Sequence, residues 1–130
     1  MTSFIEFGVA SNFTFLRGAS HPEELMAQAI ALGLDGIGLA DRNSVAGVVR
    51  AHVYLRENRE QARDFRYFVG ARLVFCDGTP DMLAYPQDRA AWGRLTRLLT
   101  RGNLRAQKGS CLLRFEDVLD FCEGLRFAVM

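Results

Sequence analysis

Three side chains in this sequence, Asp41, His21 and His52, could bind a metal or move a proton. Asp41 follows a short apolar run and precedes a helical pattern, the place where α/β proteins put catalytic and metal-binding groups. It could equally cap the following helix. His21 is interpreted as a polar residue at a helix start. His52 lies four residues after Val48, which predicts a hydrogen-bonded core histidine on the apolar face of a helix.

The remaining spacing excludes several kinds of site. The chain has no His-x-His, no His-x-x-x-His and no Gly-rich phosphate loop, and Gly36 and Gly38 lie inside a predicted strand. It also has no Ser or Cys nucleophile elbow. The three cysteines, Cys76, Cys111 and Cys122, are widely spaced and include no Cys-x-x-Cys, which predicts reduced, partly buried thiols in a cytosolic protein.

One charged segment stands out against a net charge of only +1. The stretch between Asp88 and Glu116 has seven basic residues and no acid, so the rest of the chain sums to −6. At about 100° per residue, Arg94, Arg97 and Arg101 fall on one side of a predicted helix. They could contact nucleic acid or a partner, or form a solvated face. The seven residues are Arg89, Arg94, Arg97, Arg101, Arg105, Lys108 and Arg114.

Alternating strands and helices should position these residues. Residues 4–10 and 37–40 are β-prone, and 20–33 has the Ser-x-x-Glu spacing of a capping box, from Ser20 to Glu23, with helical periodicity up to Gly33. Asn43 or Ser44 is expected to cap a second helix. Its inward residues would be valines, namely Val45, Val48, Val49 and Val53.

The second half continues with a strand over 67–75, a turn, and a returning strand over 82–85. Asp88 is expected to cap a third helix that ends near 102–103, with one apolar stripe of Ala91, Trp92, Leu95, Leu98 and Leu99. A short helix over 115–122 and a strand over 125–130 follow. This order predicts an α/β fold with a mostly parallel sheet, or part of a barrel.

The length of 130 residues and the composition predict a single domain over 1–130. No apolar run is long enough to cross a membrane and the start does not resemble a signal peptide, so a cytoplasmic protein is expected. The final apolar strand predicts that the sequence is part of a longer protein. It also predicts an apolar flank around Phe127 and Val129 that favours self-association.

Four segments carry a family resemblance. Residues 11–25 (SNFTFLRGASHPEEL), 40–52 (ADRNSVAGVVRAH), 69–73 (VGARL) and 88–100 (DRAAWGRLTRLLT) resemble the N-terminal PHP domain of bacterial C-family DNA polymerases. The similarity is closest to the error-prone branch, the ImuC-type alpha subunits of translesion synthesis. It runs in order along nearly the whole chain.

The resemblance implies a fold and a set of metal positions. The family domain is a distorted (β/α)₇ barrel longer than this chain, so the chain should be an N-terminal portion of it. Members with phosphoesterase or exonuclease activity hold metals with a first-strand His-x-His, an Asp-His and a later Glu. These align with Gly8-Val9-Ala10, Asp41-Arg42 and Arg72. Only Asp41 keeps a ligating group, so no tightly bound metal is expected, and Asp41 is expected to pair with an arginine.

The leading hypothesis is a non-catalytic structural and interaction domain of an error-prone translesion DNA polymerase. Mg²⁺ and the catalytic residues would belong to the parent polymerase outside this chain. Expected partners are the remainder of the polymerase, DNA through that parent, mutasome proteins and the sliding clamp, with no membrane. One alternative is a residual phosphoesterase or exonuclease using Asp41, Glu6 and the histidines. The other is a nucleic-acid-binding module using Arg94, Arg97 and Arg101.

Overall fold

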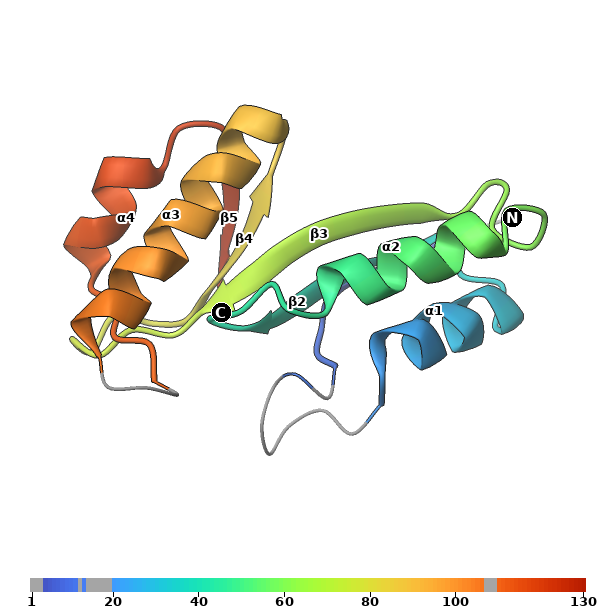
Figure 1. Ribbon diagram of the computed structural model, residues 1–130, viewed down its shortest axis with the longest axis horizontal. Helices are drawn as coiled ribbons and strands as arrows, with labels where there is room; N and C mark the ends of the chain where they lie inside the picture. Colours follow the sequence, from blue (N-terminus) through green and yellow to red (C-terminus); the bar gives the residue numbers. More distant parts are fainter. Residues whose placement is uncertain (1–3, 12, 14–19, 107–109) are drawn as a thin grey trace.

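A computed structural model describes residues 4–11, 13, 20–106 and 110–130 (Figure 1). The elements in this part of the chain follow the predicted order, with shifts of a few residues at their ends. They are β1 (Ile5–Val9), α1 (Pro22–Ala31), β2 (Gly36–Arg42), α2 (Val48–Glu57), β3 (Arg66–Leu73), β4 (Met82–Pro86), α3 (Arg89–Arg105), α4 (Phe115–Phe121) and β5 (Leu125–Val129). Lys108 and most of the segment 11–19 lie outside the described residues.

The five strands form one curled sheet in the order β1-β2-β3-β4-β5. β1, β2 and β3 run parallel, whereas β4 is antiparallel to both β3 and β5. The predicted hairpin between β3 and β4 is therefore confirmed, and the sheet is mixed rather than mostly parallel. β3 belongs to both parts, because its residues 66–72 pair with β2 and its residues 71–73 pair with β4.

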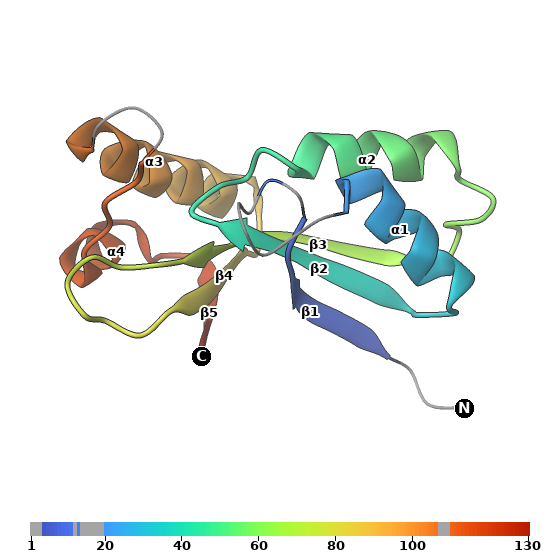
Figure 2. The same ribbon diagram turned by 90° about the horizontal axis from the view of Figure 1, so that it is seen from below.

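The helices α1, α2 and α3 cover one face of the sheet (Figure 2). Beneath α1 and α2 a small apolar cluster includes Met26, Leu39 and Ala51, and beneath α3 and α4 a larger one includes Leu73 and Leu98. On the other face, Phe7, Phe68 and Tyr85 form an aromatic group, with Phe7 5.0 Å from Phe68 and 5.3 Å from Tyr85 between ring centroids. None of the helices in the described ranges is long and apolar enough to span a membrane.

Two predicted helix caps are wrong. The N-cap of α1 is His21, which makes no side-chain capping bond, so the capping box from Ser20 to Glu23 does not form. The Glu23 carboxylate instead binds Arg50 of α2. The N-cap of α2 is Gly47, because Asn43 and Ser44 are used in the turn that leaves β2. The Asp88 cap of α3 is confirmed, since the Ala91 backbone N–H donates to its Oδ1 at 2.8 Å.

The buried face of α2 also differs from the prediction. Val48 and Ala51 are its buried residues, so the helix turns its small alanine toward the sheet. Val49 is 66% exposed, so the prediction that it faces inward is wrong. His52 is also exposed, so the prediction of a core histidine is wrong.

Exposed apolar side chains lie on the two edge strands. Phe127 and Val129 of β5 are 37% and 66% exposed, so the predicted apolar flank exists, and self-association remains a prediction. The three cysteines, Cys76, Cys111 and Cys122, are free thiols. Only Cys111 is half-buried, and burial raises its pKa, whereas Cys76 and Cys122 are exposed rather than partly buried.

Candidate functional site

The carboxyl ends of three parallel strands bring the predicted metal positions to one edge of the sheet. Gly8 and Ala10 lie at the end of β1, Asp41 and Arg42 at the end of β2, and Arg72 near the end of β3. Arg42 and Arg72 are direct neighbours in the register of β2 and β3. This is the edge at which parallel α/β sheets bind ligands.

Asp41 is a buried acceptor that ties two strand ends together. Its carboxylate is 1% exposed, and it accepts from the Ser11 backbone N–H at 2.6 Å and from the Ser11 hydroxyl at 2.7 Å. A Cβ at Gly47 would lie 3.1 Å from Asp41 Oδ2, so this glycine leaves room for the carboxylate. Asp41 does not cap α2, which begins at Val48. The expected arginine partner of Asp41 remains a prediction.

Ser11 and Tyr67 complete the surroundings of Asp41. Ser11 is fully buried, and its hydroxyl also accepts from the Phe13 backbone N–H at 3.2 Å. Burial and then the charge of Asp41 raise the pKa of Tyr67, so its phenol stays neutral and donates to the Val48 carbonyl at 3.2 Å. Sequence reasoning missed Ser11. A polar residue directly after the first strand was the available signal.

Gly8, one of the two aligned first-strand positions, has a backbone conformation that favours glycine. Gly8 has φ of +75°, and a Cβ there would lie 3.3 Å from Leu83 Cδ1. Its N–H donates to the Tyr85 hydroxyl at 2.9 Å, and that hydroxyl donates to the Gly38 carbonyl at 3.1 Å. Burial raises the pKa of Tyr85, which keeps the phenol protonated for this role. A histidine at position 8 would be strained there.

Arg72 is oriented by an ion pair across the hairpin. Its Nε and Nη2 donate to Asp81 Oδ2 at 3.0 and 2.8 Å. Arg42, its neighbour on β2, is exposed. Two arginines at this edge of the sheet disfavour the binding of a metal cation, because a guanidinium stays positively charged and has only hydrogen-bond donors.

The residues present do not fit a metal cluster. Among the described residues, no group of three or more His, Cys, Asp or Glu side chains is placed to hold a metal ion. Both oxygens of Asp41 already accept bonds from Ser11. Glu6 is exposed on β1, His52 is exposed on α2, and His21 lies 3.8 Å from Glu24 at the start of α1. The structure therefore does not bring together the residues of the phosphoesterase alternative.

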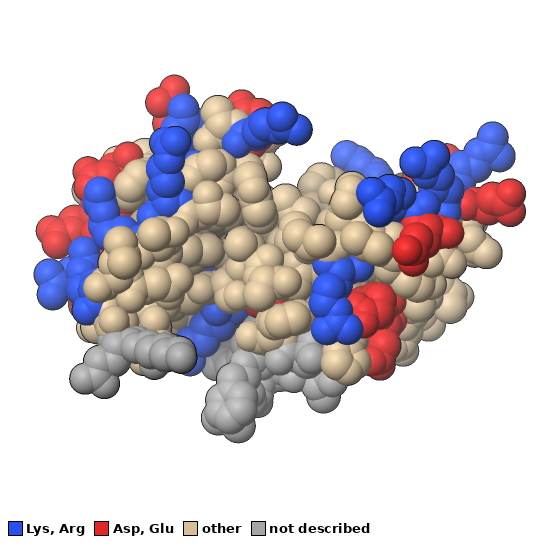
Figure 3. All heavy atoms as spheres, viewed as in Figure 1, with Lys and Arg blue, Asp and Glu red and all other residues tan. Residues whose placement is uncertain are grey.

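The arginines of α3 lie outside the leucine stripe, as predicted, but two of them face α4. Arg94 donates to the Glu123 carbonyl at 2.9 Å. Arg101 binds Asp120 at 2.6 Å and lies 3.7 Å from Asp117. Arg97 is exposed and has no partner among the described residues. Figure 3 shows acidic side chains among the basic ones on this part of the surface.

The acids of α4 therefore compensate the basic segment. Arg105 makes a two-bond pair with Asp117, at 2.6 and 2.8 Å, and Asp117 is buried. The hydrogen bonds from Arg105 lower the pKa of Asp117 to about 2 against the opposing effect of burial. A linear count of charges could not show this, because the acids follow the basic segment in sequence and pack against it in space.

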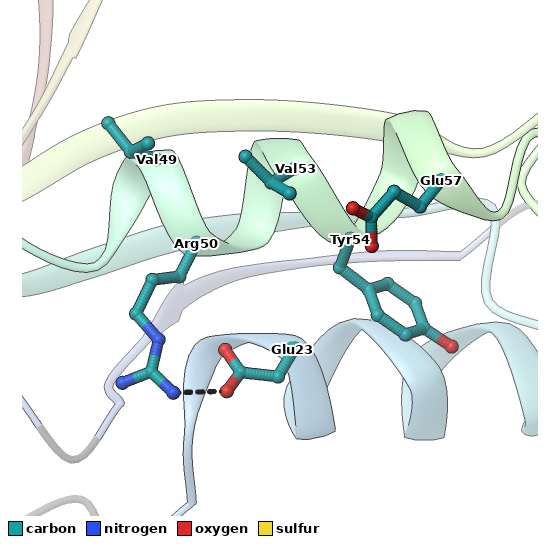
Figure 4. Close-up of a pocket in the computed structure, with 6 residues that line it drawn as sticks. All are labelled: Glu23, Val49, Arg50, Val53, Tyr54 and Glu57. Atoms are coloured by element: carbon teal, nitrogen blue, oxygen red, sulfur yellow. Dashed lines mark hydrogen bonds and ion pairs between the residues drawn. The ribbon is translucent and has the colours of Figure 1, made fainter.

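A shallow groove of about 320 Å³ lies between α1 and α2 (Figure 4). Glu23 of α1 lines it on one side, and residues of α2 line the rest. In Figure 4 the carboxylate of Glu23 reaches from α1 to Arg50 of α2, and Tyr54 points toward α1. Glu23 Oε2 is buried without a hydrogen-bond partner in the described chain. Burial acts to raise the pKa of Glu23, but hydrogen bonds and the charge of Arg50 outweigh it and lower that pKa.

Comparison with known proteins gives close relatives. The chain is 54% identical over 130 residues to an error-prone DNA polymerase of Brucella abortus biovar 1 (strain 9-941), covering 99% of this chain and 12% of that protein. It is 58% identical over 118 residues to one of Rhodopseudomonas palustris (strain BisA53), covering 91% of this chain and 10% of that protein. A third, from Sinorhizobium medicae (strain WSM419), is 50% identical over 129 residues, with 99% and 11% covered. No family model matches the chain.

Two solved structures share the fold. One is a putative metal-dependent phosphoesterase from Bifidobacterium adolescentis, with a TM-score of 0.60 and 21% identity over 80% of this chain and 34% of that one. The other is an amidohydrolase from Chromobacterium violaceum with bound sulfate and no metal, with a TM-score of 0.57, 19% identity, and 78% and 33% covered. Such neighbours confirm the expected α/β fold, a portion of a PHP-type barrel.

These three relatives are error-prone DNA polymerases, and the fold is the one that the resemblance to PHP domains predicts. The chain is therefore similar over nearly its whole length to a segment of error-prone DNA polymerases, and it spans 10–12% of the length of these relatives.

Proposed function

We propose that this chain is a non-catalytic structural and interaction domain of an error-prone DNA polymerase. The observation that supports this most directly is the state of Asp41. The one carboxylate among the aligned metal positions is buried and accepts two hydrogen bonds from Ser11. Its neighbours are glycine, alanine and two arginines, which cannot ligate a cation.

A metal titration tests the non-catalytic part of this proposal. The full chain is titrated with Mn²⁺ and Zn²⁺ by calorimetry, and hydrolysis of bis-(p-nitrophenyl) phosphate is followed in the same samples. We expect neither stoichiometric tight binding nor metal-dependent hydrolysis. The Asp41→Asn variant is the control for weak surface binding. Tight binding that this variant abolishes would support a residual phosphoesterase instead.

The interaction part of the proposal rests on the surfaces that the helices leave open. Phe7 is 48% exposed on the face opposite the helices, and Val129 is exposed on the β5 edge. Because the chain aligns with only about a third of the related barrels, the rest of a polymerase chain is the natural cover for these surfaces. DNA, the sliding clamp and mutasome proteins would then be reached through that polymerase, in the cytoplasm, where its catalytic residues would use Mg²⁺.

Reconstitution tests this partner. The Brucella abortus polymerase is prepared without the segment homologous to this chain, and binding of the chain is measured by size-exclusion chromatography. Val129→Asp is expected to weaken binding at least tenfold. Val49→Asp, at an equally exposed valine on the outer side of α2, is the matched control and should bind as the unmodified chain does. Equal binding by both variants would contradict the proposed surface.

A further inference from the structure

Tyr85 crosses the face of the sheet opposite the helices and joins strands that are not neighbours. It belongs to β4, but its hydroxyl accepts from the Gly8 N–H of β1 at 2.9 Å and donates to the Gly38 carbonyl of β2 at 3.1 Å. In the strand order, β2 and β3 lie between β1 and β4. In a flat sheet β1 and β4 would be about 14 Å apart, from a spacing of about 4.8 Å per strand, so this contact depends on the curl of the sheet (Figure 1).

Glycines in the two intervening strands leave room for the Tyr85 side chain. A Cβ at Gly70 of β3 would lie 2.6 Å from Tyr85 Cδ1, and a Cβ at Gly38 of β2 would lie 2.9 Å from the Tyr85 hydroxyl oxygen. The Phe7 ring packs against the Tyr85 ring at an interplanar angle of 78°. The tyrosine therefore lies close against the backbone of the sheet, which is the close approach that glycines in strands permit.

Gly8 uses this contact because it lies in an irregular part of β1. The register of β1 with β2 shifts between Glu6 and Val9, and Gly8 lies within the shift with φ of +75°. Such a shift takes a residue out of the regular ladder, while its N–H still needs an acceptor. The Tyr85 hydroxyl supplies that acceptor. Burial raises the pKa of Tyr85 against the opposing effect of the bond from Gly8, so the hydroxyl keeps the proton that it donates to Gly38.

We propose that Tyr85 is a positioning residue for the docking surface on β1, because it ties β1 to β4 and thereby holds Phe7 in place for the partner. This inference rests on the proposed function, in which the rest of a polymerase chain covers this face. Phe7 is 48% exposed and directly precedes Gly8, so a movement of the Gly8 backbone moves the Phe7 ring. A surface that is ordered before binding loses less conformational entropy when its partner docks.

Amide hydrogen exchange tests the tie between β1 and β4 in the full 130-residue chain. Tyr85→Phe keeps the ring and removes the hydroxyl, and we expect the Gly8 amide to exchange at least tenfold faster in this variant. Tyr67→Phe is the matched control. It also removes a half-buried phenol that donates to a backbone carbonyl, that of Val48 at 3.2 Å, but on the side of the sheet that the helices cover. It should change the exchange rate of Gly8 less than twofold.

Docking is the readout that a purely structural role of Tyr85 would leave unchanged. Binding of the chain and of both variants to the Brucella abortus polymerase that lacks the homologous segment is measured by calorimetry, at a temperature at which every variant is folded. We expect Tyr85→Phe to weaken binding at least fivefold and Tyr67→Phe to weaken it less than twofold. The removed hydroxyl itself faces the backbone of the sheet, so this loss would report on the position of β1.

Three results would overturn the proposal. These are an unchanged exchange rate of Gly8 in Tyr85→Phe, unchanged binding by Tyr85→Phe, or equal effects of Tyr67→Phe on exchange and binding. If the unmodified chain does not bind the polymerase, the docking role is overturned together with the proposed function, whereas the exchange of Gly8 still decides whether Tyr85 ties β1 to β4. If Tyr85→Phe does not fold, Gly38→Ala takes its place, because the added methyl group displaces the same hydroxyl.

Discussion

The sheet has a parallel half, formed by β1, β2 and β3 under α1 and α2, and an antiparallel half, formed by the end of β3 with β4 and β5 under α3 and α4. Different kinds of interaction stabilise each half. In the parallel half, short polar side chains at the strand ends bind backbone groups of the neighbouring strand: Asp41 binds Ser11, and Asn43 binds Val74. In the antiparallel half, α3 and α4 are joined by ion pairs centred on Asp117. In the first half, Asp41, which looked suited to chemistry, makes buried hydrogen bonds to Ser11. In the second half, Arg101 and Arg105, which belong to the basic segment, pair with acids of α4.

β3 links the halves, and this predicts cooperative unfolding. Met26 lies in the cluster of the parallel half and Leu98 in that of the antiparallel half, and both are fully buried. Replacing either by alanine should lower the free energy of unfolding by about 2–5 kcal/mol. Because β3 packs in both clusters, each variant should unfold in one transition.

Denaturant unfolding followed by two probes checks this. Trp92, the single tryptophan, lies against the cluster of the antiparallel half and reports on that half, while circular dichroism reports on the whole chain. Coincident curves for both variants are expected. Separate transitions would mean that the halves are independent units.

The second prediction concerns the strand-end contact of the parallel half. Asp41→Ala leaves the Ser11 N–H and hydroxyl buried without this acceptor, which should cost about 2–4 kcal/mol in the free energy of unfolding. Ser11→Ala removes only the hydroxyl bond and should cost about 1 kcal/mol. Denaturant unfolding at neutral pH measures both. If Asp41→Ala were as stable as the unmodified chain, Asp41 would have no structural role.

The third prediction is the acid sensitivity of the antiparallel half. Hydrogen bonds from Arg105 lower the pKa of Asp117 to about 2 in the folded chain, against an ordinary value of 3.8. A lowered folded-state pKa stabilises the fold above the unfolded pKa, and this stability is lost as the pH falls toward 2. The loss should be on the order of 2 kcal/mol.

Unfolding free energies measured between pH 5 and 2 (roughly the titration range of a carboxyl group) test this. Asp117→Asn should be less stable than the unmodified chain at neutral pH and should show a shallower fall over this range. Glu116→Gln, at the exposed acid next to it, should keep the fall of the unmodified chain. The same slope in Asp117→Asn would place the acid-sensitive group elsewhere.

The sequence predicted the order of elements because the signals for that order are local. Apolar periodicity, turn residues and the Asp88 cap need only a few neighbouring residues, and all of them led to correct elements. It also placed Asp41 at a strand end. The errors arise where a distant partner competes for the same atoms. Glu23 binds Arg50 instead of capping α1, and Asn43 binds Val74 instead of capping α2.

Local sequence patterns could not predict the hydrogen-bond partners in the candidate site either, because these partners are also distant in sequence. The hydroxyl of Tyr85 meets Gly8, which is 77 residues away in sequence, and no pattern around either residue indicates the contact. Tertiary packing also determines which face of α2 is buried, because the faces that contain Ala51 and Val49 overlap in the sequence pattern. The stripe that contains Ala51 lies against the sheet, and Val49 was left in solvent.

The last and smallest prediction separates the three arginines that the sequence grouped. Arg101 binds Asp120 and lies 4.6 Å from the ring centroid of Phe121, so Arg101→Gln should cost up to about 1 kcal/mol. Arg97 has no partner among the described residues, so Arg97→Gln should change stability by less than about 0.5 kcal/mol. Thermal unfolding of the two variants measures this difference.

DNA binding at two salt concentrations completes the comparison. A charge already compensated by an acid contributes little to a phosphate contact, whereas an uncompensated one contributes to affinity and to its salt dependence. We therefore expect Arg97→Gln to weaken DNA binding more than Arg101→Gln, with a shallower salt slope. Equal effects on DNA binding would mean that the pairs with α4 open when DNA is present. In that case the two halves of the molecule would differ in rigidity as well as in chemistry, since the contacts between Ser11 and Asp41 in the parallel half are buried.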